Sequence, residues 1–222
     1  MSPPEVLFVE DDPAIRETTM LVLGGLGFEV TPAPDGQAGL DAFRAAEPDV
    51  ALLDVMLPHI DGISLTSLIR ARSMVPVVLL SARSDPLDVV AGLEAGADDY
   101  VTKPYDGPVL AARLRAVLRR AGRVEDADGI LRFGELEVDP AGMAARVSGR
   151  VVRLTPTEAR LLSELARNAG IVLNRDTLLE RVWDYACGGD TRLVDVHIQR
   201  LRAKVDAGRI ETVRGVGYKL VR

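Results

Sequence analysis

Cysteine is almost absent from this 222-residue sequence, whose only cysteine is Cys187. A single cysteine cannot form an intramolecular disulfide, which fits a reducing compartment such as the cytosol. Long apolar segments are absent too, because no stretch approaches the roughly 20 apolar residues that a membrane helix needs. The first residues also lack the basic and apolar regions of a secretory signal. These absences predict a soluble, cytoplasmic protein that does not associate with a membrane.

The charge is unevenly distributed along the chain. Residues 1–121 hold 10 basic and 18 acidic residues, a net charge of −8, and residues 122–128 carry −2. Residues 129–222 hold 16 basic and 12 acidic residues, a net charge of +4. A basic half joined to an acidic half favours nucleic-acid contact by the basic half. Chance variation in surface charge explains the same numbers, so the function has to be inferred from motifs.

The first half of the chain alternates short apolar runs with segments of helical length. Apolar runs without polar alternation are typical of strands that are buried on both faces. Their alternation with helices predicts an α/β domain, a doubly wound, five-stranded parallel sheet with helices on both sides. The runs are 6–9, 29–31, 50–53, 77–80 and 100–102, and the helical segments are 13–26, 35–46, 62–72, 85–95 and 107–120.

Residues 122–128 break this pattern, because they are polar and show no apolar periodicity. We interpret them as a linker. The sequence therefore predicts two domains, 1–121 and 129–222.

The second half has a different order of elements. Residues 130–154 read as short antiparallel strands, and a closing hairpin is expected over 210–221. Between them a helix begins at Thr155, with Pro156 at its first position and Glu158 completing a capping box. Two more helices are expected at about 175–182 and 191–206. Three helices followed by a hairpin predict an α+β winged helix-turn-helix domain.

Polar side chains follow four predicted strands of the first domain where the strands end. Glu10–Asp12 follow the first strand, Asp54 the third, Ser81 the fourth and Lys103 the fifth. In an open parallel sheet, ligands bind at this edge. Close carboxylates repel each other unless a cation intervenes, and an oxygen-only ligand set favours Mg²⁺. A metal ion beside a carboxylate and a lysine suits phosphoryl transfer to the carboxylate.

Each of these residues taken alone has a simpler explanation. An aspartate at a strand end is usually a helix N-cap, and a serine or lysine there is usually solvated. Their combination at four strand ends is much harder to explain in that way.

The motifs that carry these residues resemble those of response-regulator receiver domains, which have a flavodoxin-like fold. With the second half included, the chain resembles the OmpR/PhoB family of two-component response regulators over nearly its full length. The motifs are Val9–Asp12, Asp54–Pro58 with Asp61 and Gly62, Ser81–Arg83, and Gly96–Pro104.

The resemblance implies a phosphorylation site. Asp54 would be phosphorylated by a sensor histidine kinase. The ligands of Mg²⁺ would be Glu10, Asp11, Asp54 and the backbone carbonyl of Met56.

The resemblance also implies phosphoryl-binding and switch residues. Lys103, joined to Pro104 by a cis bond, would pair with the phosphoryl group. Ser81, which stands where many members have threonine, would donate a hydrogen bond to it. Tyr100 would rotate together with Ser81, and small Ala82 would leave the phosphoryl group room.

A basic helix face in the second half is most often only solvated. Here the face lies between a capped helix pair and a hairpin, which favours insertion into the major groove. The resemblance implies contacts to double-stranded promoter DNA from this helix and from the wing, and Gln199 replaces a residue that is often basic. The DNA-binding residues would be Arg192, His197, Arg200, Arg202, Lys204, Thr212, Arg214 and Tyr218.

Two further partners follow from the resemblance. The loop 183–190, which contains Cys187, matches a segment that contacts RNA polymerase in this family. Phosphorylation would favour a homodimer that binds tandem half-sites. The dimer interface would contain Val89, Asp98, Asp99, Val109, Arg113 and Arg120. Val89 and Val109 stand where a basic and an acidic residue usually pair, so a hydrophobic contact would replace one salt bridge, and solvated arginines are the simpler alternative.

Two other function classes remain open at this stage. A phosphoaspartate hydrolase requires a second aspartate two residues after the nucleophile, and this chain has Met56 at that position. A constitutive DNA-binding protein with an inert receiver is disfavoured by the complete set of pocket residues. The protein is therefore expected not to be an enzyme. Its first half also resembles regulators of cell-envelope stress in high-GC Gram-positive bacteria, and 24 of its 27 basic residues are arginine.

Overall fold

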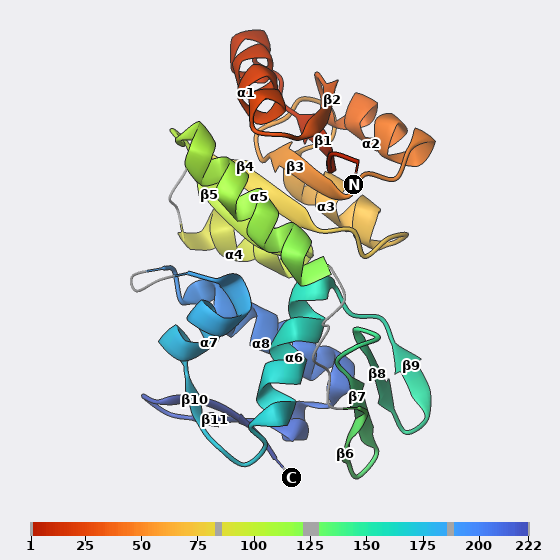
Figure 1. Ribbon diagram of the computed structural model, residues 1–222, viewed down its shortest axis with the longest axis vertical. Coiled ribbons are helices and arrows are strands. Elements are labelled where there is room, and N and C mark those ends of the chain that lie inside the picture. The colour runs from red at the N-terminus through yellow and green to blue at the C-terminus, as the bar shows by residue number, and fades with distance from the viewer. Residues whose placement is uncertain (1, 83–85, 122–128, 186–188, 222) are drawn as a thin grey trace. The chain divides into compact units, whose positions relative to one another are not determined.

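The computed structural model describes residues 2–82, 86–121, 129–185 and 189–221 (Figure 1). The chain divides into two compact units, Met1–Arg119 and Arg120–Arg222. The linker predicted at 122–128, Arg83 and Cys187 lie outside the described residues. Within the described part of the chain, no helix combines the length and the apolar character needed to cross a membrane.

The first unit alternates strands and helices, as the sequence predicts. Its five strands all pair in parallel, in the order β2-β1-β3-β4-β5. This is the flavodoxin-like order of a doubly wound sheet, so the predicted fold class is confirmed. The elements are β1 (Glu5–Val9), α1 (Pro13–Gly25), β2 (Glu29–Ala33), α2 (Gly36–Ala45), β3 (Val50–Asp54), α3 (Gly62–Arg70), β4 (Val77–Ser81), α4 (Pro86–Ala95), β5 (Asp99–Thr102) and α5 (Gly107–Ala121).

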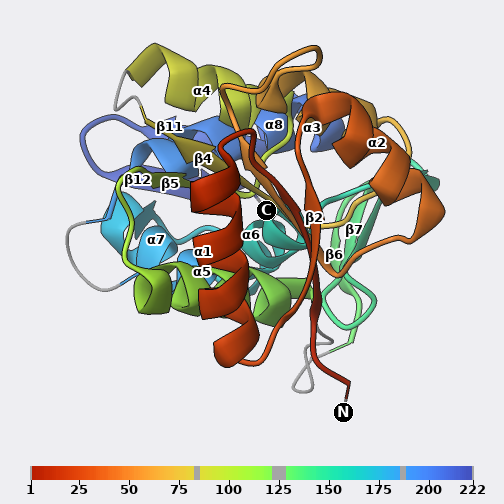
Figure 2. The same ribbon diagram turned by 90° about the horizontal axis from the view of Figure 1, so that it is seen from above.

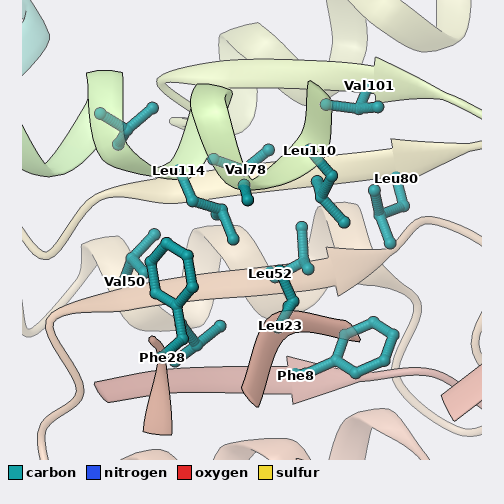
Figure 3. Packing of buried hydrophobic residues seen from close by; sticks show 13 residues of the cluster. Phe8, Leu23, Phe28, Val50, Leu52, Val78, Leu80, Val101, Leu110 and Leu114 are labelled. Carbon is teal, nitrogen blue, oxygen red and sulfur yellow. The ribbon is translucent and has the colours of Figure 1, made fainter. Parts of the chain in front are cut away.

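Helices α1 and α5 cover one face of this sheet, and α2, α3 and α4 cover the other (Figure 2). Strand residues two positions apart, such as Val6 and Phe8 on β1, point to the same face. They pack with Leu23 of α1 and with Leu110 and Leu114 of α5 in one buried cluster (Figure 3). Full burial of each such side chain contributes about 1.5–3 kcal/mol. This packing fixes the strand ends that carry the predicted site.

The second unit begins with a four-stranded antiparallel sheet in the order β6-β7-β8-β9. Three helices follow, and a three-stranded sheet in the order β10-β12-β11 forms the wing. The predicted winged helix-turn-helix domain is confirmed. The elements are β6 (Leu131–Phe133), β7 (Leu136–Asp139), β8 (Ala144–Val147), β9 (Arg150–Val152), α6 (Pro156–Arg167), β10 (Leu173–Asn174), α7 (Arg175–Trp183), α8 (Arg192–Val205), a 3₁₀ turn (Ala207–Arg209), β11 (Ile210–Val213) and β12 (Gly217–Leu220).

The start of α6 has the predicted capping box. The Thr155 side chain accepts a bond from the backbone nitrogen of Glu158 at 3.3 Å, and the Glu158 carboxylate accepts one from the Thr155 nitrogen at 2.9 Å.

Strand β10 was not predicted, because two residues are too few to show an apolar period. It pairs with β12 through a close backbone approach at Gly217, where a Cβ atom would lie 1.9 Å from the carbonyl oxygen of Leu173. Only glycine fits at this position.

Candidate functional site

The acidic pocket lies at the carboxyl ends of β1 and β3. Glu10 follows β1, its backbone nitrogen bonded to the Ala33 carbonyl at 3.1 Å, and Asp54 is the last residue of β3. Glu10, Asp11 and Asp54 each offer a carboxylate oxygen, and these oxygens all lie within 4.8 Å of one another. Glu10 and Asp54 are buried and Asp11 is exposed. An oxygen-only set of this kind, open to solvent on one side, fits Mg²⁺ that keeps some of its water.

Lys103 joins the two buried carboxylates. Its Nζ atom lies 2.6 Å from Glu10 Oε2 and 2.9 Å from Asp54 Oδ2. Burial alone lowers the pKa of Lys103, but the hydrogen bonds and negative charges of Glu10 and Asp54 outweigh it, so the pKa is raised. Burial raises the pKa of Glu10, and the bond to Lys103 offsets this only in part. The pocket therefore holds three carboxyl groups and one ammonium group. The excess negative charge favours the binding of a cation.

Two neighbours of the acidic residues have supporting contacts. The Asp12 side chain accepts bonds from the backbone nitrogens of Ala14 and Ile15 at 2.8 and 3.0 Å, which makes it the N-cap of α1. Arg16 Nη1 donates to the carbonyl oxygens of Glu10 and Asp11 at 2.6 and 3.1 Å. Arg16 was not predicted at this site, because its only signal in the sequence is a basic residue one helical turn after the acidic motif.

The start of α3 lies directly behind Asp54. A Cβ atom on Gly62 would stand 2.0 Å from the Asp54 carbonyl oxygen, so glycine is required for this close approach. Asp61 caps the helix by accepting bonds from the Ser64 backbone nitrogen at 2.8 Å and hydroxyl at 2.7 Å. Burial raises the pKa of Asp61, but these bonds outweigh that effect and hold the pKa below its usual value.

The other predicted pocket residues lie around the same edge. Ser81, the last residue of β4, is buried. Its backbone carbonyl accepts a hydrogen bond from the backbone nitrogen of Lys103 at 2.7 Å. Ala82 is exposed, beside a surface hollow of about 590 Å³ that Lys103 also lines. Tyr100 is half-buried on β5. The Met56 side chain is largely exposed. The backbone nitrogen of Met56 donates a hydrogen bond to Asp54 Oδ1 at 3.3 Å. The Lys103–Pro104 bond is cis, as expected.

All five predicted DNA-binding residues of α8 have partners within the second unit. Arg192 pairs with Asp190 at 2.6 Å. His197 Nδ1 lies 2.8 Å from the Leu193 carbonyl oxygen of the same helix.

Arg200 and Lys204 are both paired with one buried carboxylate of α6. Arg200 Nη2 lies 2.9 Å from Glu158 Oε1, and Lys204 Nζ lies 2.6 Å from Glu158 Oε2. The capping box revealed Glu158 in the sequence, but not these pairs, because α8 is about 45 residues away in the chain.

The wing residues are likewise joined to the helices. Thr212 Oγ1 accepts a bond from Arg202 Nη2 at 2.6 Å. The Tyr218 hydroxyl is bonded to Asp195 of α8 at 2.7 Å. Arg214 is exposed at the tip, beside Gly215, whose φ of 72° favours glycine.

The residues predicted at a dimer interface differ in their surroundings. Asp98 is buried, and its Oδ2 accepts bonds from Arg70 Nη2 at 2.6 Å and from the Val77 nitrogen at 3.1 Å. Asp99 Oδ1 lies 3.8 Å from Arg113 Nη1 of the same chain. Val89 is buried, Val109 is half-exposed, and Arg120 lies near the end of α5.

Two sequence families match the chain, one for each unit. Residues 6–115 match the response regulator receiver domain, and residues 149–220 match the C-terminal domain of transcriptional regulatory proteins.

Several characterised proteins are similar over nearly their whole length. The chain is 62% identical to the transcriptional regulatory protein CseB of Streptomyces coelicolor over 226 residues, 97% of each chain. It is 47% identical to the DNA-binding response regulator MtrA of Mycolicibacterium smegmatis, covering 96% of this chain and 95% of MtrA.

Solved structures are similar as well. The Thermotoga maritima response regulator DrrB, an OmpR/PhoB homologue, is 33% identical, with a TM-score of 0.52 over 99% of this chain and 100% of DrrB. A C128D mutant of RitR gives a TM-score of 0.77 at 26% identity over 98% of each chain. The chain therefore belongs to the OmpR/PhoB family of two-component response regulators, DNA-binding transcriptional regulators rather than enzymes, in which a receiver domain precedes a winged-helix domain.

Proposed function

We propose that a sensor histidine kinase phosphorylates Asp54 and that this modification controls promoter binding by the winged-helix domain. The observation that carries the proposal is the contact of Lys103 with both Glu10 and Asp54, beside the exposed carboxylate of Asp11. The proposal is supported by the closeness of three groups, which are a candidate nucleophilic oxygen, a positive charge and a set of candidate oxygen ligands.

The chemistry is an in-line phosphoryl transfer. An Asp54 carboxylate oxygen forms a bond to phosphorus while the bond to the kinase histidine nitrogen breaks, which yields an acyl phosphate. Lys103 pairs with a phosphoryl oxygen, and the Ser81 hydroxyl donates to another. When bound by Glu10, Asp11, Asp54 and the Met56 carbonyl, Mg²⁺ supplies further charge neutralisation.

The surrounding residues relay the change. Ala82 leaves space for the phosphoryl group, and Tyr100 follows the inward movement of Ser81. Phosphorylation then favours a homodimer, whose two winged-helix domains bind tandem half-sites.

The DNA interface in this proposal consists of α8 and the wing. Its residues are Arg192, His197, Arg200, Arg202, Lys204, Thr212, Arg214 and Tyr218. The loop 183–190, of which 186–188 lie outside the described residues, contacts RNA polymerase. We place the protein in the cytoplasm, and we propose cell-envelope stress as its stimulus because its first half resembles regulators of that response.

The phosphorylation proposal is tested with acetyl phosphate and Mg²⁺, followed by intact-mass measurement. The parent protein is expected to gain one phosphoryl group and the Asp54→Asn variant none. Asp35→Asn is the matched control, because it makes the same substitution at the N-cap of α2, outside the pocket. Undiminished phosphorylation of Asp54→Asn would identify a different acceptor.

The DNA interface is tested by binding at several salt concentrations. Affinity should fall steeply with salt, because counterions are released from the DNA. Losing one base-reading arginine of α8 should cost roughly 1–3 kcal/mol of discrimination between sequences. Arg214→Ala should weaken all sequences evenly. If Arg200→Ala and Arg202→Ala both leave affinity and discrimination unchanged, α8 is not the reading helix.

A further inference from the structure

Four side chains from α7, α8 and β12 meet at the base of the wing. We call Arg175, Asp195, Arg202 and Tyr218 the wing-base cluster. Arg175 is the first residue of α7, Asp195 and Arg202 lie on α8, and Tyr218 lies on β12.

Three members of the cluster form a closed triangle of hydrogen bonds. Asp195 Oδ1 accepts from Arg175 Nε at 2.7 Å and from the Tyr218 hydroxyl at 2.7 Å. The Tyr218 oxygen in turn accepts from Arg175 Nη2 at 3.0 Å. The Arg175 guanidinium also lies 4.8 Å from the centre of the Tyr218 ring, within the range of a cation–π contact.

Arg202 joins the other wing strand to α8. Its Nε and Nη2 atoms donate to the Ile210 carbonyl oxygen at 3.0 and 2.7 Å, and Nη2 also donates to Thr212 Oγ1 at 2.6 Å. Its guanidinium lies 5.7 Å from the Tyr218 ring. Both strands of the wing hairpin are thus attached to α8 by side chains, β12 through Asp195 and β11 through Arg202.

Asp195 stabilises the protonated forms of Arg175 and Tyr218. The bond to Asp195 raises the pKa of Arg175. Burial, and then the bond to Asp195, raises the pKa of Tyr218. The donors of the triangle therefore keep their protons at neutral pH.

A side-chain attachment is needed because the wing itself is small. A two-stranded hairpin is at best marginally stable in water. Among the described residues, the hairpin is extended by β10 alone, and this strand contributes two residues. Backbone pairing alone therefore fixes the angle between the wing and α8 weakly.

Asp195 lies in the first turn of α8, where the helix dipole favours a carboxylate, but its charge is opposite to that of the other charged residues of the helix. The helix otherwise presents Arg192, Arg200, Arg202 and Lys204, and a carboxylate near phosphates repels them. Its side chain is 44% exposed, so burial does not explain it. The hydrogen bonds that it accepts from Arg175 and Tyr218 instead give this carboxylate a structural role.

We propose that Asp195 and Arg175 are positioning residues for DNA recognition, which hold the wing at a fixed angle to α8. The wing tip at Arg214 and the bases read by α8 are then engaged together. This inference rests on the proposed DNA-binding function.

The test compares the full-length phosphorylated parent with Asp195→Asn, Arg214→Ala and the double variant. The probe is a duplex of about 30 base pairs that the parent selects from a random-sequence pool, long enough for two half-sites one helical turn apart. Charge alone predicts that Asp195→Asn binds more tightly. We expect it to bind about tenfold more weakly. The slope of log affinity against log salt concentration should become shallower by the equivalent of about one phosphate contact.

The double variant separates positioning from a general loss of stability. If Asp195 acts by placing Arg214, the double variant binds like Arg214→Ala alone. The matched control is Glu137→Gln, which removes the same charge from the exposed Arg132–Glu137 pair and should bind like the parent. Asp195→Glu, which keeps the carboxylate, should recover most of the affinity.

Arg175→Lys is measured beside these variants, with thermal unfolding of each. It keeps the charge and loses the fork that bonds both Asp195 and Tyr218, so weaker binding is expected here too. Unchanged or tighter binding by Asp195→Asn, or losses that multiply in the double variant, overturns the inference. Failure of the parent to select any duplex, or parent-like binding by Arg214→Ala, overturns the proposed wing contact instead.

Discussion

At the scale of single residues, three aspartates in or after the ends of β1 and β3 have different roles that their surroundings decide. Asp12 and Asp61 each accept backbone hydrogen bonds at a helix start. Asp54 instead faces Lys103, with its oxygens directed into the acidic pocket. The same residue type therefore serves as a cap or as a candidate nucleophile, depending on which donors lie within reach.

The Asp61 cap gives a pH-dependent prediction. Its pKa is lowered from 3.8 in the folded protein, so the ionised carboxylate stabilises the fold above that value. This stability is lost as the pH falls through the folded pKa. Asp61→Ser keeps a cap but does not titrate, so the parent should exceed it in stability at about pH 7 and lose that advantage as the pH falls below 3.8 and through the folded pKa. Urea unfolding followed by circular dichroism measures the difference. An advantage that persists unchanged at the lower pH would contradict the assigned role.

At the scale of elements, the orientation of α8 on α6 depends on one buried carboxylate. Glu158 is fully buried, and it accepts the Thr155 nitrogen and pairs with Arg200 and Lys204. A buried carboxylate with two cationic partners is costly to disturb, because its removal leaves the cations without compensation.

We therefore expect Glu158→Ala to destabilise the winged-helix domain by about 3 kcal/mol or more. Denaturant unfolding followed by the fluorescence of Trp183, the only tryptophan, reports on this domain. Glu137→Ala, which removes an exposed ion-paired glutamate from β7, should cost about 1 kcal/mol or less. Equal effects of the two substitutions would show that the buried pairs do not anchor α8.

At the scale of the whole molecule, phosphorylation is proposed to act through dimerisation of the receiver. Asp99 and Arg113 already lie 3.8 Å apart within one chain, and Val109 is half-exposed on the same helix as Arg113. A face that combines these residues is partly ionic and partly apolar. Its salt sensitivity should be milder than that of a fully ionic face.

Charge reversal tests this face. Asp99→Arg should keep the phosphorylated full-length protein monomeric, because it places two like charges together, and adding Arg113→Asp should restore the dimer. Size-exclusion chromatography with light scattering measures the mass of each variant with and without acetyl phosphate. Dimerisation of the single variant to the same extent as the parent would place the interface elsewhere.

The sequence alone determined the order of the elements and the positions of the pocket residues. Apolar runs, helix caps and turn glycines are local signals, so they predicted five parallel strands, the winged helix and the residues at each strand end. The order in which the strands pair was not predicted, because the same alternation of strands and helices is compatible with more than one doubly wound order.

Only the tertiary structure decided which charges meet. Glu10 and Lys103 are 93 residues apart, and Glu158 and Lys204 are 46 apart, so no local period records either pair. Likewise Asp98 belongs with Arg70, and Asp195 with Arg175 and Tyr218. A side chain's charge is written in the sequence, but its partner is fixed by the packing of the strands and helices that carry both, because salt bridges act over a few ångströms.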